Sequence, residues 1–183
     1  MAFRLADDID KHPDLAIERG RDKSGVGAWV PNEKHTYLAK YVEGTRQARK
    51  KYPRRVYIDL FCGPGRIQVK GEDRTRHGGA QIAWLHSKLD QASFTDCFVG
   101  DLDAERASAC ERRLSALGAN VKSFAGPAET VVDQVIAALL IGHDAFARQV
   151  QRYRIARTNL NEISLSVARN AAMLRSARKI ADE

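Results

Sequence analysis

Residues 56–66 decide the fold, and they read Val56-Tyr57-Ile58-Asp59-Leu60-Phe61-Cys62-Gly63-Pro64-Gly65-Arg66. The first six of these residues form a short β-branched and aromatic run, which is typical of a buried strand. The strand leads directly into a turn that holds two glycines. Glycine has no Cβ and accepts positive φ, so such a turn lets the backbone approach a ligand closely.

Predicted strands and helices alternate along the chain on either side of this turn. Residues 66–77 are expected to form a polar loop. The predicted strands are residues 56–61, 94–99 and 120–124, and the predicted helices are residues 31–51, 79–89, 104–117 and 128–140. This alternation implies an α/β fold, with a parallel sheet of about three strands, right-handed crossovers and flanking helices.

The composition divides the chain into three regions. Residues 1–27 are polar and acidic and end in a glycine-rich stretch, which predicts a flexible N-terminal arm. Residues 28–142 hold the predicted α/β domain. Residues 143–183 are basic and contain no Gly or Pro between Asp144 and Ala181. Their apolar residues recur at an imperfect heptad spacing, which predicts a long helical tail that could bind a protein partner.

The overall composition is that of an ordinary soluble protein. The 183 residues are 44% hydrophobic and 29% charged, which excludes collagen-like and wholly disordered chains. No stretch approaches the roughly 20 apolar residues of a membrane span, and no signal peptide is recognised, so we expect a cytoplasmic protein without membrane contact. Three cysteines without a CxxC pair and five scattered histidines predict neither a disulfide framework nor a metal site.

The net charge of +7 is unevenly distributed. One basic run extends from Arg46 to Arg55, and the other basic region is the tail. A basic surface attracts phosphate-bearing partners through counterion release, so the 46–55 run is a candidate nucleic-acid contact. A solvated helix face explains the same charges without any partner.

An acidic residue follows the second predicted strand, in Val99-Gly100-Asp101-Leu102-Asp103. A carboxylate there can accept hydrogen bonds from both hydroxyls of a ribose. A glycine turn after one strand and an acid after the next are typical of nucleoside-cofactor sites in open α/β sheets. The sequence GxxxxGK[ST] is absent, so this is not a phosphate-binding P-loop. A glycine turn that binds no cofactor is the competing interpretation.

The pattern D-x-F-x-G-x-G resembles the first motif of class I S-adenosylmethionine-dependent methyltransferases, which have a Rossmann-like sheet. The motif falls on Asp59, Phe61, Gly63 and Gly65, and Asp101 matches the ribose-binding acid. The resemblance implies S-adenosyl-L-methionine as cofactor, with its methionine part at the glycine turn and its ribose at Asp101. The acid that many family members place after strand three is replaced by Pro127, one turn before Glu129.

A narrower resemblance covers about residues 28–140. Trp29, Lys34, Leu38 and Tyr41 form the pattern W-x4-K-x3-L-x2-Y before YIDLFCGPGR, and Gly78-Gly79-Ala80 and FVGDLD follow. This succession looks like the three-Cys-motif partner (TcmP) proteins, a bacterial and phage-associated group with a methyltransferase-like domain. The aromatic residues Trp29 and Tyr41 are expected to pack their helix onto the sheet, with stacking on a ligand as the alternative.

The catalytic part of a methyltransferase is not recognisable. Only three of the family's seven strands are predicted, and neither [DNS]PP[YFW] nor a Pro-Cys nucleophile occurs. Cys62 is expected to be a small buried residue, and no catalytic residue is identified. After about residue 140 the chain is interpreted as truncated, frame-shifted or a divergent family member.

Two functions of different classes therefore remain open. The first is a methyltransferase-like protein with cofactor-binding motifs and no visible catalytic motif. The second is a non-catalytic nucleic-acid- or protein-interaction module built on a half sheet. A non-functional fragment is the third interpretation.

Overall fold

A computed structural model of the chain describes residues 9–140. The chain forms two compact units, residues 1–135 and 136–183, and the described part of the second unit is residues 136–140. The basic helical tail expected at residues 143–183 lies outside the described residues, and so does any partner contact it makes.

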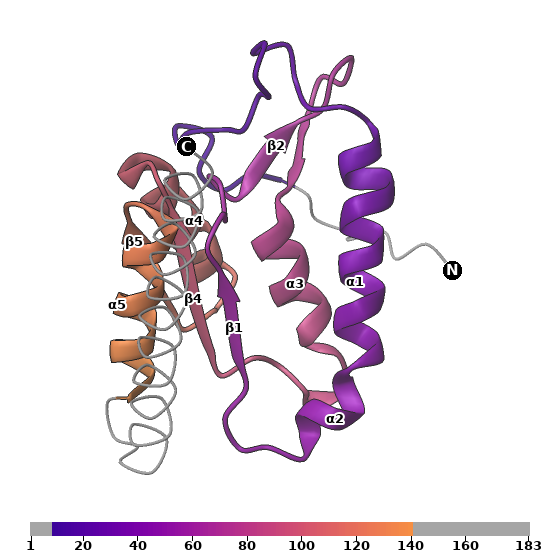
Figure 1. Cartoon of the computed structure of the whole chain (residues 1–183). Coiled ribbons are helices and arrows are strands. Elements are labelled where there is room, and N and C mark those ends of the chain that lie inside the picture. The colour runs from indigo at the N-terminus through magenta and orange to yellow at the C-terminus, as the bar shows by residue number, and fades with distance from the viewer. Residues whose placement is uncertain (1–8, 141–183) are drawn as a thin grey trace, which may run out of the picture. The chain divides into compact units, whose positions relative to one another are not determined.

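The described residues form a mixed α/β structure (Figure 1). The strands are β1 (Val56–Asp59), β2 (Arg66–Gln68), β3 (Thr75–His77), β4 (Asp96–Asp101) and β5 (Val121–Ala125). The helices are the π-helical turn η1 (Val30–Lys34), α1 (His35–Gly44), α2 (Arg46–Lys50), α3 (Gly79–Ser87), the 3-10 turn η2 (Leu89–Gln91), α4 (Ala104–Ala116) and α5 (Ala128–Leu140). Within residues 9–140, none of the helices has the length and apolar composition to cross a membrane.

The predicted parallel sheet is confirmed. Its order is β1-β4-β5, and both pairs of neighbours are parallel. Asp59 at the end of β1 lies opposite Val99, and Asp101 at the end of β4 lies opposite Ala125. Consecutive parallel strands need a long connection, which α3 and α4 supply here. Among the described strands, β1 pairs only with β4, so it forms one edge of the sheet.

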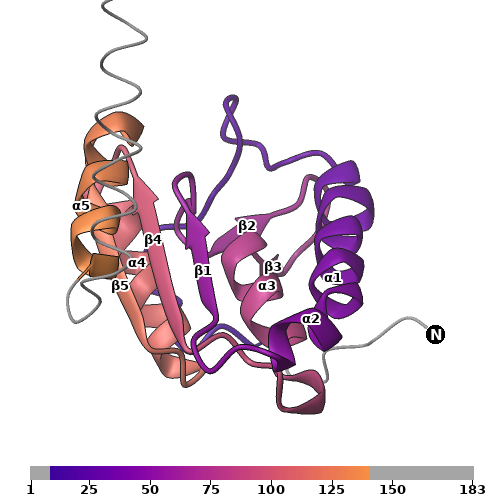
Figure 2. The ribbon, with the colours of Figure 1, turned by 60° about the horizontal axis from the view of Figure 1, so that its bottom comes forward.

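Alternate residues of the strands face opposite sides of the sheet. One side packs against α3 and α4, and Figure 2 shows α3 between β1 and α1. This core includes Tyr57, Trp84, Cys97, Val99, Cys110 and Leu114. On the other side Phe98 stacks on Phe124, and a Cβ added to Gly100 would come within 2.7 Å of Val131 in α5. Gly100 therefore lets α5 approach the sheet closely.

The helix predicted over residues 31–51 is divided into three parts. Helix α1 ends at Gly44, and α2 begins at Arg46. Between them Thr45 has a ψ of 1°, and its hydroxyl donates to the carbonyl oxygens of Tyr41 and Val42 at 3.0 and 3.1 Å. A threonine that bonds back to the preceding turn competes with regular helix geometry, which explains the break.

The polar loop predicted for residues 66–77 is wrong. Strands β2 and β3 form an antiparallel hairpin there, with Arg66 opposite His77. Ile67 and Val69 are 6% and 1% exposed, so the hairpin contributes apolar side chains to the interior. Two apolar residues among charged and polar neighbours are too few for periodicity to indicate a strand pair.

The described part of the N-terminal arm, residues 9–27, is hydrogen-bonded to this hairpin. The Glu18 amide donates to the Arg66 carbonyl at 2.9 Å, and the Gln68 amide donates to the Glu18 carbonyl at 2.8 Å. Val26 makes a second parallel bridge, to Val69. Pairing between segments about 50 residues apart leaves no local sequence signal, because neither partner predicts the other.

The buried guanidinium of Arg113 in α4 connects the arm to the rest of the domain. It forms two hydrogen bonds with the Asp10 carboxylate, at 3.2 and 2.8 Å, and its side chain is 1% exposed. The other bonds go to the carbonyl oxygens of His12, Leu15, Ala16 and Pro64. Burial would raise the pKa of Asp10, but the hydrogen bonds from Arg113 and the His12 amide, together with the charges of Arg113 and Arg66, outweigh it and lower that pKa below its ordinary value.

Replacement of Arg113 by methionine should strongly destabilise the domain, because it removes these bonds and leaves Asp10 without its main partner. We expect Arg113→Met to lower the free energy of unfolding by roughly 3–5 kcal/mol in a urea titration. Arg112→Met is the matched control, since Arg112 is exposed on the same helix. A control loss within about 0.5 kcal/mol is expected. Equal stability of the two variants would contradict a central role for Arg113.

The buried His35 predicts a pH dependence of stability. Burial, followed by the charges of Lys34 and His77, lowers the pKa of His35 from 6.5 to about 4. The unfolded chain therefore binds a proton below pH 6.5 that the folded domain does not, and stability falls as the pH drops from 6.5 towards 4. We expect the free energy of unfolding of the wild type to lose about 3 kcal/mol more over this range than that of His35→Gln. Parallel curves for the two proteins would refute this assignment.

Candidate functional site

The carboxyl ends of β1 and β4 lie side by side because the two strands are parallel neighbours. The turn after β1 is bonded to the end of β4 at two points. The Cys62 amide donates to the Gly100 carbonyl at 2.9 Å, and the Gly63 amide donates to Oδ2 of Asp101 at 3.0 Å. A hydrogen bond therefore links the glycine turn directly to the acid that was predicted to act with it.

The Asp59 carboxylate stabilises the turn by accepting two hydrogen bonds from nearby residues. Its Oδ1 accepts the Phe61 amide, and its Oδ2 accepts the Tyr57 hydroxyl, both at 3.1 Å. Burial, with the nearby charge of Asp59, raises the pKa of Tyr57 well above its ordinary value, so this phenol stays protonated and donates. Asp59 therefore shapes the turn and does not bond to Asp101 directly.

The Asp101 carboxylate also contacts α4. Its Oδ1 accepts the Asp103 amide at 3.1 Å and lies 3.5 Å from Nε of Arg106. Arg106 forms a second ion pair, with Glu18 of the N-terminal arm. Burial alone would lower the pKa of Arg106, but the hydrogen bond and charge of Glu18, with Asp101, raise it above its ordinary value. The arginine is thus a fixed positive charge beside Asp101.

Apolar side chains at this end of the sheet are exposed. Phe61 is 79% exposed and Leu102 is 75% exposed, one on each strand end. On the β5 side, the Gly126 amide donates to the Asp101 carbonyl at 3.0 Å. Pro127 follows, and Glu129 is exposed in the first turn of α5. The strand ends therefore place exposed apolar side chains near a partly buried carboxylate.

Gly65 connects the turn to α4 by close packing. Its φ is +82°, and an added Cβ would lie 3.3 Å from the Cα of Cys110. Cys62, Cys97 and Cys110 are free and buried. The hydrogen bond with Cys62, and then burial, raise the pKa of the Cys110 thiol well above its ordinary value. Burial raises the pKa of Cys97 to about 12. Buried thiols of this kind are poor nucleophiles.

The five residues predicted from sequence thus fall into three groups. Gly63 and Asp101 are bonded to each other, Asp59 and Gly65 hold the turn, and Phe61 is exposed beside it. Sequence reasoning missed Glu18 and Arg106. Arg106 lies in the first turn of α4, which Asp103 caps, but nothing in the sequence connects it with an acid 88 positions earlier.

The basic run predicted to contact nucleic acid has several internal partners. Arg49 donates to the carbonyls of Val42 and Ala92, and Arg55 donates to those of Tyr52 and Ser93. Ion pairs also join Arg46 and Lys50 to Asp90, and Arg54 to Asp96. Much of this charge therefore fastens the α2–β1 segment to residues 89–96. A nucleic-acid contact through residues 46–55 stays a prediction.

Comparisons of the chain with protein-family models, with curated proteins and with solved structures find no match. Within residues 9–140, no three or more His, Cys, Asp or Glu side chains are grouped so that they could hold a metal ion. The site is therefore described by its own geometry: a glycine turn, a partly buried acid and exposed apolar residues.

The close packing of Gly65 can be tested against a second glycine. Gly118 has nearly the same φ, +83°, but an added Cβ there would meet nothing within 4 Å. We expect Gly118→Ala to cost about 1–2 kcal/mol of unfolding free energy from backbone strain. Gly65→Ala should cost about 1–3 kcal/mol more, because its methyl group would crowd Cys110. Equal losses in urea unfolding would show that the turn is free to move away from α4.

Proposed function

We propose that the chain binds S-adenosyl-L-methionine at the carboxyl ends of β1 and β4, as a methyltransferase-like protein of the three-Cys-motif partner type. The observation that carries the proposal is the bond between the Gly63 amide and Asp101, which joins the two motifs 38 residues apart. The sheet order β1-β4-β5 with helical crossovers is also what one half of a Rossmann-like sheet requires.

The residues at this end of the sheet fit a nucleoside. The Gly63 amide engages Oδ2 of Asp101, and the Asp103 amide and Arg106 engage Oδ1, so one of the carboxylate's about four acceptor positions is left for a ribose hydroxyl. Phe61 and Leu102 offer apolar surface to the base or the aliphatic chain. The backbone of Gly63–Gly65 would approach the methionine part. No acid follows β5 directly, so the base would be held mainly by apolar contact.

The chemistry of the bound cofactor would be donation of its sulfonium methyl group. The described residues would supply binding: Asp101 would accept a ribose hydroxyl, Asp59 keeps the turn in shape through its two hydrogen bonds, and Arg106 contacts Asp101. The three thiols are buried, so none is available as a nucleophile within residues 9–140. The proposal is accordingly cofactor binding, with no catalytic residue and no methyl acceptor assigned.

Calorimetric titration of S-adenosyl-L-methionine into the full chain tests this. Asp101→Asn should weaken binding by about tenfold or more, because hydrogen bonds to a charged acceptor are replaced by weaker ones. Phe61→Ala should weaken it several-fold. Asp73→Asn is the matched control, an exposed aspartate at the β2–β3 turn, and it should bind as the wild type does.

Failure of the wild type to bind, or an unchanged affinity in Asp101→Asn, would overturn the proposal. A cooperative thermal transition in each variant excludes loss of folding as the reason. The alternative of a non-catalytic interaction module would then be favoured. Two observations support this alternative. The described residues contain a folded half sheet without an accessible nucleophilic thiol. Lys51 in the basic run is exposed and forms no ion pair with another described residue.

A further inference from the structure

The outward face of α1 and of the turn before it carries exposed aromatic residues. Trp29, Tyr37 and Tyr41 are 60%, 68% and 71% exposed. The prediction that Trp29 and Tyr41 pack their helix onto the sheet is wrong, because both side chains are largely exposed. The inner face of α1 is formed instead by His35, Leu38 and Val42, which are buried or partly buried.

Most of each of these side chains lies outside the interior of the domain. Among the described residues, the hydroxyls of Tyr37 and Tyr41 make no hydrogen bond, and the ring contact of Tyr37 is with Lys40, whose Nζ lies 5.8 Å from the ring centre. The Trp29 indole lies over Gly27, where an added Cβ would come within 2.8 Å of it. Exposed aromatic residues grouped on one element indicate an interaction surface.

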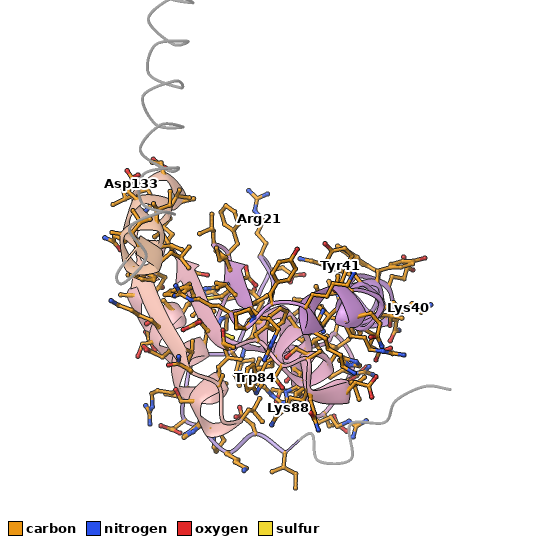
Figure 3. All side chains as sticks on the ribbon, turned by 90° about the horizontal axis from the view of Figure 1, so that it is seen from below. Arg21, Lys40, Tyr41, Trp84, Lys88 and Asp133 are labelled. Atoms are coloured by element: carbon orange, nitrogen blue, oxygen red, sulfur yellow. The ribbon has the colours of Figure 1, made fainter. Side chains whose placement is uncertain are left out.

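The charges on this face have one dominant sign. Lys34 and Lys40 are exposed beside the rings, and Figure 3 shows Lys40 and Tyr41 on the outside of α1. Glu33 is an exposed acid, whereas Glu43 is bonded to His86 at 2.7 Å. Lys34, Tyr37 and Tyr41 follow one another at three- and four-residue steps, so they lie on one side of the helix. Tyr37 and Tyr41 are about 6 Å apart along the axis.

We propose that this α1 aromatic face (Trp29, Lys34, Tyr37, Lys40 and Tyr41) binds single-stranded nucleic acid. The tyrosines and the tryptophan stack on unpaired bases, and the lysines contact the phosphates. Alternation of aromatic rings and cations is the common arrangement of surfaces that bind single strands without sequence preference. Double-stranded DNA would leave the rings unused, since its bases are already stacked.

The composition of the face argues against other occupants. A second copy of the chain would bring lysines opposite lysines in a two-fold contact, which is unfavourable. An apolar protein helix would need aliphatic pockets, and the exposed residues of α1 include no Leu, Ile, Val or Met. A polyanion with planar groups can pair with the lysines and stack on the aromatic rings. The proposal uses no residue of the proposed cofactor site.

Fluorescence anisotropy with labelled 20-nucleotide oligo(dT) and oligo(U), and with a 20-base-pair duplex, tests the proposal. The full chain should bind one or both single strands more tightly than the duplex, and the two single-strand arms distinguish DNA from RNA. Tyr37→Ala combined with Tyr41→Ala should raise the Kd for the single strand at least about tenfold. The matched control combines Tyr37→Phe with Tyr41→Phe, which keeps both rings and should stay within about twofold of the wild type.

The lysines have a separate readout. Lys34→Gln with Lys40→Gln should reduce the slope of log K against log salt by about 1.4, since each phosphate contact with a single strand contributes about 0.7. No binding of either single strand by the wild type, equal binding of the duplex, or equal Kd values for the alanine and phenylalanine variants would overturn the proposal. Binding of S-adenosyl-L-methionine should not change in these variants, so failure of one proposal leaves the other to be judged by itself.

Discussion

The rest of the structure depends on the hydrogen bonds that the buried guanidinium of Arg113 donates. The guanidinium donates hydrogen bonds to the Asp10 carboxylate and to carbonyl oxygens of the N-terminal arm, and the Arg113 side chain is only 1% exposed to solvent. The same group bonds to the Pro64 carbonyl within the glycine turn at 2.7 Å. One charge in α4 therefore fixes the arm and the turn together. A buried charge is costly, and here several oxygen acceptors offset that cost.

The site at the strand ends therefore depends on residues that are distant in the sequence. Glu18 from the arm pairs with Arg106, which contacts Asp101. The Glu18 backbone is in turn bridged to β2. Displacement of the arm would therefore remove a partner of the arginine beside the candidate ribose acid. The geometry of Asp101 depends on residues that precede the α/β domain in sequence.

The sequence predicted the elements with local signals and missed those with distant partners. β-branched and aromatic runs indicated β1, β4 and β5, and their alternation with helical segments predicted a parallel sheet. The hairpin β2–β3 was missed because its buried residues, Ile67 and Val69, stand among polar neighbours. Arg66 was expected to be a loop residue, yet it is 1% exposed and bonded to Thr75. For the site, the glycine turn and Asp101 have a motif, whereas the Glu18–Arg106 pair has none.

The burial of all three thiols has a consequence for how opening of the domain can be observed. Cys62 lies in the glycine turn, Cys110 on the helix it packs against, and Cys97 in the central strand. Reagents that alkylate thiolates should modify none of them while the domain is closed, because each is inaccessible and protonated thiols react slowly. Labelling rates under native conditions would then report separation of the turn from α4 at Cys62 and Cys110, and global unfolding at Cys97. The chain thus carries natural probes for local and global opening, without any engineered residue.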